Sequence, residues 1–419
     1  MNKKCVLALL VALTMSTITG CGLAGKVAKT VMENETTVIA ETTTEGEMTE
    51  TEETTEETAE EETSEEESAE RLTGTPILGD TDISYDGYAY LEQIDIENED
   101  GEDITVFIPI DDYNYVDDTS ADASAMGVSF DVNADPYLQY NAKDYTIQEN
   151  MQYMLDSAYD PFYYPENRDL TFSEFEGDDT YAKCDVSYIK KEYDGEYHTY
   201  YATYYLMETK KNSYISVMVE ISKDDVTGKT PALIAELESF YQFDINWDEE
   251  EAQAKEDAFL ADPSAFPNTY SVSGLLFELP SEWDQDSGYG EYDEYYFAPD
   301  GDMSTANTFV EITYNYTSDA EATMGALLTD PKQAEELLKT SYGDMVDTIS
   351  ASNIGETSLG KTIKVEMTVS EDEESVDMEQ YIGQVDGTLY VITVGSYQGD
   401  EEGFSVAADI LENAQTRKY

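Results

Sequence analysis

The sequence contains one order of strand and helix patterns twice, at a spacing of roughly 170 to 177 residues. In each copy an apolar strand pattern ends at a proline, Pro109 or Pro280, and an aromatic residue follows three or four positions later, Tyr113 or Trp283. A β-rich stretch, an amphipathic helix, a further strand, a long hairpin and a final amphipathic helix then follow in both copies. This shared order predicts a duplicated domain, and the folded part is larger than one hydrophobic core usually is.

The two predicted domains span residues 76–247 and 263–419, and an acidic linker at 248–262 joins them. The pattern of residues 248–260 is that of a short acidic helix or of a linker. Their long strand patterns are separated by turn sequences such as Asp386-Gly387, which closes tight hairpins. Because strands joined by hairpins pair antiparallel, we expect the α+β class, with two tandem copies of an antiparallel β-sheet flanked by helices. The strand pattern at Tyr200–Met207 is apolar on both faces, which predicts a central place in its sheet.

The second copy carries the motif Phe277-Glu-Leu-Pro-Ser-Glu-Trp283, and the first copy has Tyr113 where the Trp would stand. Mid-domain helix patterns run from Ile147 to Ala158 and from Ala334 to Met345. Together with the hairpin and the final helix, these features resemble the superfamily of the photosystem PsbP subunit and the Ran-binding Mog-one protein. The resemblance implies a sheet sandwiched by helices and a role in binding and assembly, and it transfers no site residue.

The N-terminus has the build of a signal peptide over residues 1–20, with Lys3 and Lys4 before a short apolar run. The run is shorter than the roughly 20 apolar residues of a membrane span. The sequence Ile18-Thr19-Gly20-Cys21 resembles the lipobox of bacterial lipoproteins. That resemblance implies cleavage before Cys21, acylation of its thiol, and an extracytoplasmic chain anchored to the cell membrane by lipid.

The predicted anchor is followed by a tether at residues 21–75. Residues 33–70 hold 17 Glu and 11 Thr, with no Lys, Arg or aromatic residue. A segment with so few apolar side chains cannot offset the entropy of ordering, so we expect disorder and extension by self-repulsion. The tether would hold the folded part away from the lipid surface, or it would be a linker without a further role.

The formal net charge of −72 argues against a nucleic-acid partner, because phosphate binding requires clustered Lys and Arg. The single His198 lies in a strand pattern, and the sequence has no G-x-S-x-G nucleophile motif, which favours a sheet histidine over a catalytic one. If Cys5 is lost with the signal peptide and Cys21 is acylated, Cys184 is the one remaining thiol, and its strand pattern predicts a buried core residue. We therefore expect no catalytic residue and no cofactor.

Carboxylates are so abundant that a close pair carries little information about a hydrolase without geometry. Neither Asn98–Gly101 nor Pro299–Gly301 fits the ligand pattern of an EF-hand loop. A weak, irregular calcium site remains open at Asp117–Asp122 or at Asp284–Glu294.

Tyrosine accounts for 34 residues, and two loops concentrate them, at Tyr159–Pro165 and Tyr289–Phe297. Exposed tyrosines supply amphipathic contact area at a low cost in entropy. We take Trp283, Tyr289, Tyr292 and Tyr295 as a candidate partner-binding loop. The alternative is that these rings cover half-buried sheet faces.

These patterns together predict a surface-anchored lipoprotein that acts as a non-enzymatic binding module for an extracellular protein or glycan. One alternative is a carboxylate-based extracellular hydrolase. Another is a solute-binding lipoprotein, which would require parallel βαβ units around a cleft. Residues 76–419 carry a net charge of −60, so we expect partners that are neutral, cationic or bridged by cations.

Overall fold

The computed structural model describes residues 72–416, with gaps at 75, 78–82, 86–89, 99–100, 102, 111–112, 140, 162–166, 193–194, 210–212, 287–293, 317–319, 372–373 and 398–401. The predicted signal peptide, the lipobox cysteine Cys21 and the tether to residue 70 therefore lie outside the described residues. Within the described part, no helix has both the length and the apolar character needed to cross a membrane.

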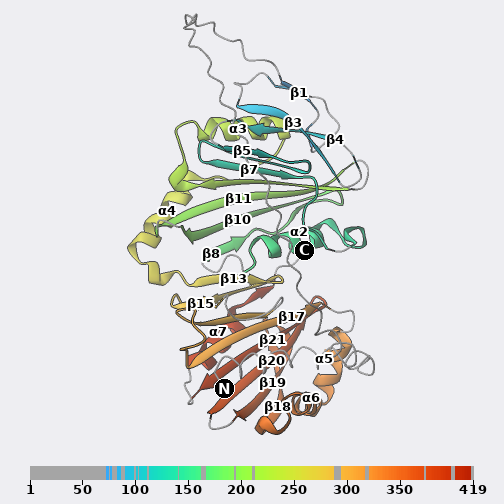
Figure 1. The fold of residues 1–419 in the computed structure, drawn as a ribbon, viewed down its shortest axis with the longest axis vertical. Helices are drawn as coiled ribbons and strands as arrows, with labels where there is room; N and C mark the ends of the chain where they lie inside the picture. Colours follow the sequence, from blue (N-terminus) through green and yellow to red (C-terminus); the bar gives the residue numbers. More distant parts are fainter. Residues whose placement is uncertain are drawn as a thin grey trace, which may run out of the picture.

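The first half of the fold, called unit 1 here, is a sheet built almost wholly from hairpins (Figure 1). Its elements are β1 (Leu72–Gly74), β2 (Ile83–Tyr85), β3 (Leu91–Glu97), β4 (Asp103–Pro109), β5 (Tyr113–Val116), β6 (Ser120–Ala125), β7 (Val128–Asn133), α2 (Ile147–Ala158), β8 (Asn167–Phe172), β9 (Glu176–Gly177), β10 (Tyr181–Lys191), β11 (Tyr197–Glu208), β12 (Tyr214–Ser222) and α3 (Thr230–Tyr241). Strand β11 pairs with β10 and with β12, which confirms the predicted central place of Tyr200–Met207.

The second half, called unit 2 here, follows the helix α4 (Glu249–Ala261). Its elements are β13 (Asn268–Val272), β14 (Leu275–Leu279), β15 (Trp283–Gln285), β16 (Glu294–Pro299), β17 (Thr308–Tyr316), α5 (Ala320–Thr329), α6 (Lys332–Tyr342), β18 (Val346–Thr357), β19 (Gly360–Glu371), β20 (Glu374–Val385), β21 (Thr388–Tyr397), α7 (Glu402–Asn413) and β22 (Gln415–Thr416).

The described strands pair antiparallel throughout, and the helices lie on the sheet faces, so the chain belongs to the α+β class. The strand order is β8-β10-β11-β12-β7-β6-β5 in unit 1 and β18-β19-β20-β21-β17-β16-β15 in unit 2. The two orders are the same when the strands are numbered within each unit. Parallel βαβ units, which a solute-binding fold would require, are not found among the described strands.

Each unit has three layers. In unit 1 the β3-β4 hairpin and α3 cover one face of the sheet, where Phe107 packs against Phe240, and α2 covers part of the other face. In unit 2 the β13-β14 hairpin and α7 cover one face, and α5 and α6 cover the other. Apolar residues at three- and four-residue spacing produce these helices, and a capping box between Thr146 and Glu149 starts α2.

The β13-β14 hairpin belongs to both units. Its apolar side chains lie in the core of unit 2, while β13 continues the sheet of unit 1 by pairing with β8 at Asn268 and Arg168. The Arg168 guanidinium also donates to the carbonyl oxygens of Phe266, at 3.3 Å, and Ser281, at 3.1 Å. The sheet that contains unit 1 therefore runs without a break into the start of unit 2 (Figure 1).

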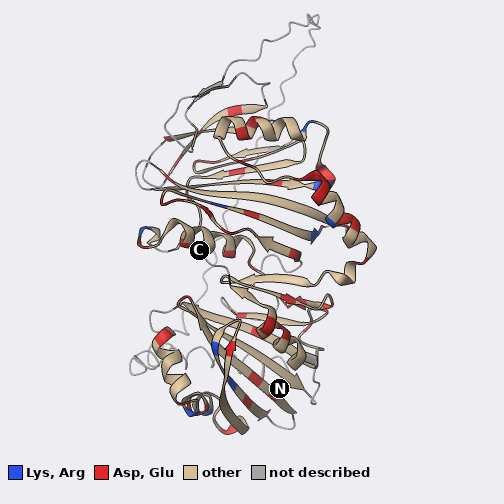
Figure 2. Ribbon diagram, turned by 180° about the vertical axis from the view of Figure 1, so that it is seen from behind, with Lys and Arg blue, Asp and Glu red and all other residues tan. Residues whose placement is uncertain are grey.

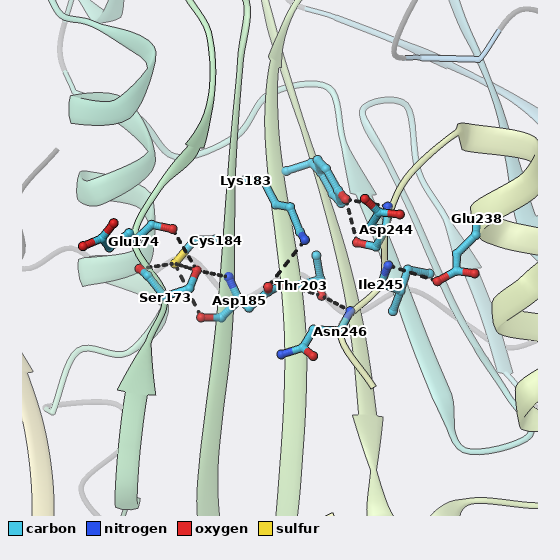
Figure 3. Close-up of polar contacts among 11 residues, drawn as sticks. Ser173, Glu174, Lys183, Cys184, Asp185, Thr203, Glu238, Asp244, Ile245 and Asn246 are labelled. Carbon is cyan, nitrogen blue, oxygen red and sulfur yellow. Dashed lines mark hydrogen bonds and ion pairs between the residues drawn. The ribbon is translucent and has the colours of Figure 1, made fainter. Parts of the chain in front are cut away.

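A chain of polar contacts fixes the segment after α3 onto the sheet of unit 1 (Figure 3). The Asn246 backbone N–H donates to the Thr203 hydroxyl at 3.0 Å, and that hydroxyl donates to Asp185 at 2.9 Å. Lys183 lies 3.4 Å from the second oxygen of Asp185. Cys184 is fully buried beside these residues, which confirms the prediction of a core thiol.

The acidic segment predicted as a short helix or a linker contains the helix α4. The Asp248 carboxylate caps its first turn by accepting hydrogen bonds from the backbone N–H groups of Glu250 and Glu251. The ring of Phe259 packs against Tyr197 of unit 1. Lys255 lies 2.8 Å from Asp169 of unit 1. The helix is therefore docked on unit 1 by a ring contact and an ion pair.

Two carboxyl groups on sheet strands, the buried Glu311 and the partly buried Asp131, have raised pKa values. Burial, chiefly, together with the nearby Glu294, raises the pKa of Glu311 on β17 to about 8, although a hydrogen bond from Thr393 acts in the opposite direction. Desolvation, followed by the hydrogen bond and the charge of the adjacent Asp122, raises the pKa of Asp131 on β7. One oxygen of Glu311 has no hydrogen-bond partner, so ionisation there is costly.

We predict that Glu311 makes the chain less stable as the pH rises. The carboxyl titrates near 4.5 when unfolded and near 8 when folded, so between these values the folded chain holds a proton that the unfolded chain has lost. The stabilisation is complete below about pH 4.5 and is lost as the pH rises through 8, with a magnitude on the order of a few kcal/mol. Denaturation at pH 5 and pH 8.5 measures it.

In the Glu311→Gln variant, the free energy of unfolding should depend less on pH than in the wild type. The raised pKa of Asp131 should account for part of the dependence that remains. Glu356→Gln on the exposed face of β18 is the matched control and should leave the dependence unchanged. Equal pH dependence in the wild type and in Glu311→Gln would contradict the assignment.

Candidate functional site

A cleft of about 150 Å³ lies where the outer face of α2 meets the end of the unit 2 sheet. Unit 1 contributes residues of α2 and of the segments before and after it, and unit 2 contributes residues of β13, the turn after β13, β16, β17 and β21. The cleft is lined by Tyr137, Gln139, Glu149, Gln152, Tyr153, Asp156, Ser157, Asp160, Ser271, Ser273, Tyr295, Tyr314 and Thr388. We call it the inter-unit cleft.

The unit 1 wall carries a pair of stacked tyrosines. The rings of Tyr137 and Tyr153 have centroids 5.5 Å apart and planes inclined by 26°. Tyr137 is 56% exposed, so its ring is available at the mouth of the cleft. Tyr153 is placed by the helical spacing of α2, which turns Glu149, Tyr153 and Asp156 toward one side.

The unit 2 wall carries a second stacked pair. The rings of Tyr295 and Tyr314 have centroids 6.4 Å apart and planes inclined by 13°. They come from the adjacent strands β16 and β17. The Tyr295 hydroxyl donates to Asp160 of unit 1 at 2.9 Å, so this wall is tied to the opposite unit.

The floor of the cleft is the tight turn between β13 and β14. Ser273 and Gly274 have φ values of 48° and 79°, the left-handed region that a tight hairpin turn requires. The Gly274 N–H donates to Asp156 of unit 1 at 3.0 Å, and the Ser273 carbonyl accepts from the Tyr390 hydroxyl of unit 2 at 2.5 Å. The turn is therefore fixed by a hydrogen bond to each of the two units.

Gln152 supplies an acceptor that the described protein groups do not satisfy. Its side chain is 5% exposed, and its Nε2 donates to Asp156 at 2.7 Å. That contact fixes the orientation of the amide, and the Oε1 atom has no hydrogen-bond partner. A buried acceptor of this kind is costly unless a ligand or water donates to it.

The cleft is acidic. Among the described residues, its lining includes Glu149, Asp156 and Asp160 and contains no Lys or Arg. Asp and Glu are spread over both units, whereas Lys and Arg occur at few places (Figure 2). The local lining and the surrounding field both favour a neutral or cationic ligand over an anionic one.

The predicted partner-binding loop differs from the observed arrangement. Trp283 has no exposed surface and Tyr295 is 5% exposed, so the expectation of exposed rings at these two positions is wrong. Trp283 begins β15 and is covered by the β13-β14 hairpin and α7. Tyr289 and Tyr292 lie outside the described residues. Of the four, Tyr295 lines the inter-unit cleft.

The other candidate residues have structural partners. His198 lies in β11, as expected, and contacts Asp224. Asp117 accepts from the backbone N–H groups of Thr119 and Ser120, and these hydrogen bonds lower its pKa. Within the described residues no group of three or more His, Cys, Asp and Glu side chains could hold a metal ion. The stretch Asp284–Glu294 lies partly outside the described residues.

Sequence reasoning missed Tyr137, Gln152, Asp156 and Tyr314. Gln152 and Asp156 follow the ordinary polar pattern of an amphipathic helix, and Tyr314 continues an ordinary strand pattern. Tyr153, four residues before Ser157 on the same helix face, was the available signal, because an aromatic residue on a polar helix face suggests a covered or ligand-binding surface.

Comparisons with known proteins give little more. No protein-family model matches the chain, and no curated protein sequence matches it. A crystal structure from Bacteroides thetaiotaomicron VPI-5482 is similar over 35% of this chain and 46% of that chain, with 12% identity and a TM-score of 0.24. The match therefore spans less than half the length of that chain, and a likeness at this level carries no argument about fold or function.

We predict that Asp156→Ala loosens the contact between the units. The change removes the acceptor of the Gly274 N–H and of Gln152 Nε2, and a buried donor left without a partner costs about 1–3 kcal/mol. The Gly274 amide should exchange with deuterium faster, and the free energy of unfolding should fall. Glu336→Ala, at an exposed position of α6, is the control. Unchanged protection of the Gly274 amide would contradict this role of Asp156.

Proposed function

We propose that the chain is a surface-anchored, non-enzymatic binding module and that its ligand, an extracellular glycan or protein group, enters the inter-unit cleft. One observation carries the proposal: two stacked tyrosine pairs from different units line one cleft, and its lining also includes Gln152, whose buried Oε1 has no hydrogen-bond partner. Tyrosine faces pack on apolar faces of ligands, and a few fixed polar groups then set orientation.

The size and chemistry of the cleft favour a sugar ring over a protein surface. Its volume of about 150 Å³ is comparable to that of a cavity that holds one six-membered ring. The C–H face of a sugar packs on a tyrosine ring, while its hydroxyl groups donate to carboxylate and amide oxygens such as those of Asp156 and Gln152. A protein partner would contact mainly the exposed rim at Tyr137.

The remaining parts of the proposal concern location and origin. We take the chain to be a lipoprotein held outside the membrane by a lipid on Cys21 and lifted from the surface by the Thr- and Glu-rich tether. The shared strand order of the two units supports their origin as tandem copies of one domain, with boundaries near 76–247 and 263–419. A PsbP-like or Mog-one-like ancestry for that domain is part of the same proposal.

The second candidate function is a carboxylate-based hydrolase, because Glu149, Asp156 and Asp160 line the same cleft. Each of these groups already accepts hydrogen bonds: Glu149 from Thr146, Asp156 from Gly274, and Asp160 from Tyr295. Carboxylates held in this way are suited to fixing the cleft and its ligand. Release of reducing sugar by the wild type and its loss in Asp160→Asn would favour the hydrolase.

We predict that Tyr137→Ala weakens glycan binding by the full chain. Removing one ring of a stacked aromatic wall should cost about 0.5–1.5 kcal/mol, which is roughly a twofold to tenfold loss of affinity. A glycan array followed by calorimetry on the captured glycan measures the loss. Tyr115→Ala is the matched control, because Tyr115 is 49% exposed and lies on β5, away from the cleft. If both variants lose the same amount of affinity for the glycan, the glycan binds outside the inter-unit cleft.

We predict that Cys21→Ala moves the chain from the membrane fraction to the medium, because the lipid would have no attachment point. Fractionation of cells that produce each form measures the shift. Retention of Cys21→Ala in the membrane fraction would rule out the proposed anchor without bearing on the cleft.

A further inference from the structure

We infer that the group bound in the inter-unit cleft is a hexosamine with a free, protonated amine, so that the partner is a cationic amino-sugar polymer. This inference rests on the proposed function and names its ligand class. Four independent features of the cleft carry it: size, ring surfaces, an orphan acceptor and charge.

The first feature is size. The cleft has room for about one six-membered ring, and its floor, the Ser273-Gly274 turn, is fixed from both units. A ring that carries an amine fits this volume more readily than a ring that carries an acetamide group. The cleft should therefore discriminate by acetylation.

The second feature is the arrangement of rings. Aromatic faces attract a nearby cation through the ring quadrupole, and the attraction is stronger when the cation is desolvated. The Tyr137-Tyr153 pair offers such faces from unit 1, and the partly exposed Tyr314, which is stacked on the buried Tyr295, offers one from unit 2. A sugar ring with an ammonium group uses both properties of tyrosine, the apolar face and the quadrupole.

The third feature is the unsatisfied acceptor. Gln152 Oε1 is buried without a partner, and the contact of Gln152 Nε2 with Asp156 fixes the amide so that Oε1 stays an acceptor. A hydrogen bond from an ionised donor is roughly twice as strong as one from a neutral donor. An ammonium group would therefore form a stronger hydrogen bond with Gln152 Oε1 than a neutral hydroxyl or amide group would.

The fourth feature is charge. The part of the cleft lining that the structure describes has three carboxylates and no Lys or Arg, and residues 76–419 carry a net charge of −60. This field raises the local concentration of cations and opposes acidic sugars. Affinity that depends on it should fall as salt is added, because exposed charges are screened beyond about 10 Å at 0.1 M salt.

The test is calorimetric titration of the full chain with four probes: a glucosamine tetramer, the fully N-acetylated tetramer, a galacturonic acid tetramer and tetralysine. We expect the glucosamine tetramer to bind at least tenfold more tightly than the acetylated one, and the acidic tetramer to give no binding. Raising NaCl from 50 to 500 mM should weaken binding of the glucosamine tetramer several-fold.

Two variants locate the site. Glu149→Gln removes one negative charge from the cleft while keeping a side chain that can complete the capping box of α2, so the fold should persist. We expect it to weaken glucosamine binding about threefold or more. Glu412→Gln, at an exposed position of α7, changes the net charge by the same amount and should leave the affinity unchanged.

The outcomes separate this inference from the proposed function. Equal or tighter binding of the acetylated tetramer would overturn the amino-sugar inference and leave the glycan-binding proposal standing. Binding of tetralysine without the glucosamine tetramer would overturn the choice of a sugar. Equal losses in Glu149→Gln and Glu412→Gln would show general attraction to a polyanion and overturn the site. No binding of any probe, together with an empty glycan array, would remove both proposals.

Discussion

The Ser273-Gly274 turn is the contact on which the relation between the two units depends. Asp156 of unit 1 accepts from one of its backbone groups, and Tyr390 of unit 2 donates to another. The hairpin that carries the turn fills the core of unit 2 and also extends the sheet of unit 1 through Asn268 and Arg168. Because this one hairpin lies in the core of unit 2 and also pairs with the sheet of unit 1, it fixes the two units next to each other. The cleft beside it therefore has one wall from each unit.

At the same junction, two of the chain's many acidic side chains have a structural role. A carboxylate on a surface helix such as α2 ordinarily faces water and contributes little to stability. Here Asp156 and Asp160 accept hydrogen bonds from Gly274 and Tyr295 across the junction between the units. Acidic side chains thus help to build the junction, while the scarcity of Lys and Arg leaves the cleft without a competing cation in its lining.

The order of elements could be predicted from the sequence because hairpins and amphipathic helices leave local patterns. The strands at Tyr200–Met207 and Val310–Tyr314 and the helix that begins at Ile147 lie where their periodicity predicts. The junction could not be predicted, because it depends on single contacts between distant residues, such as Arg168 with Phe266 and Ser281. Trp283 was misjudged for a related reason: it follows Pro280 as a loop residue would, but it packs into a core formed with the preceding hairpin and with α7, a helix far along the chain.

The central claim is that one ligand contacts both units at the cleft, and hydrogen exchange of the full chain with and without a glucosamine oligomer tests it most directly. The claim predicts slower exchange in two separated segments, residues 137–160 of unit 1 and the strands that carry Tyr295 and Tyr314 in unit 2. Slower exchange in one unit alone, or in segments away from both, would contradict it.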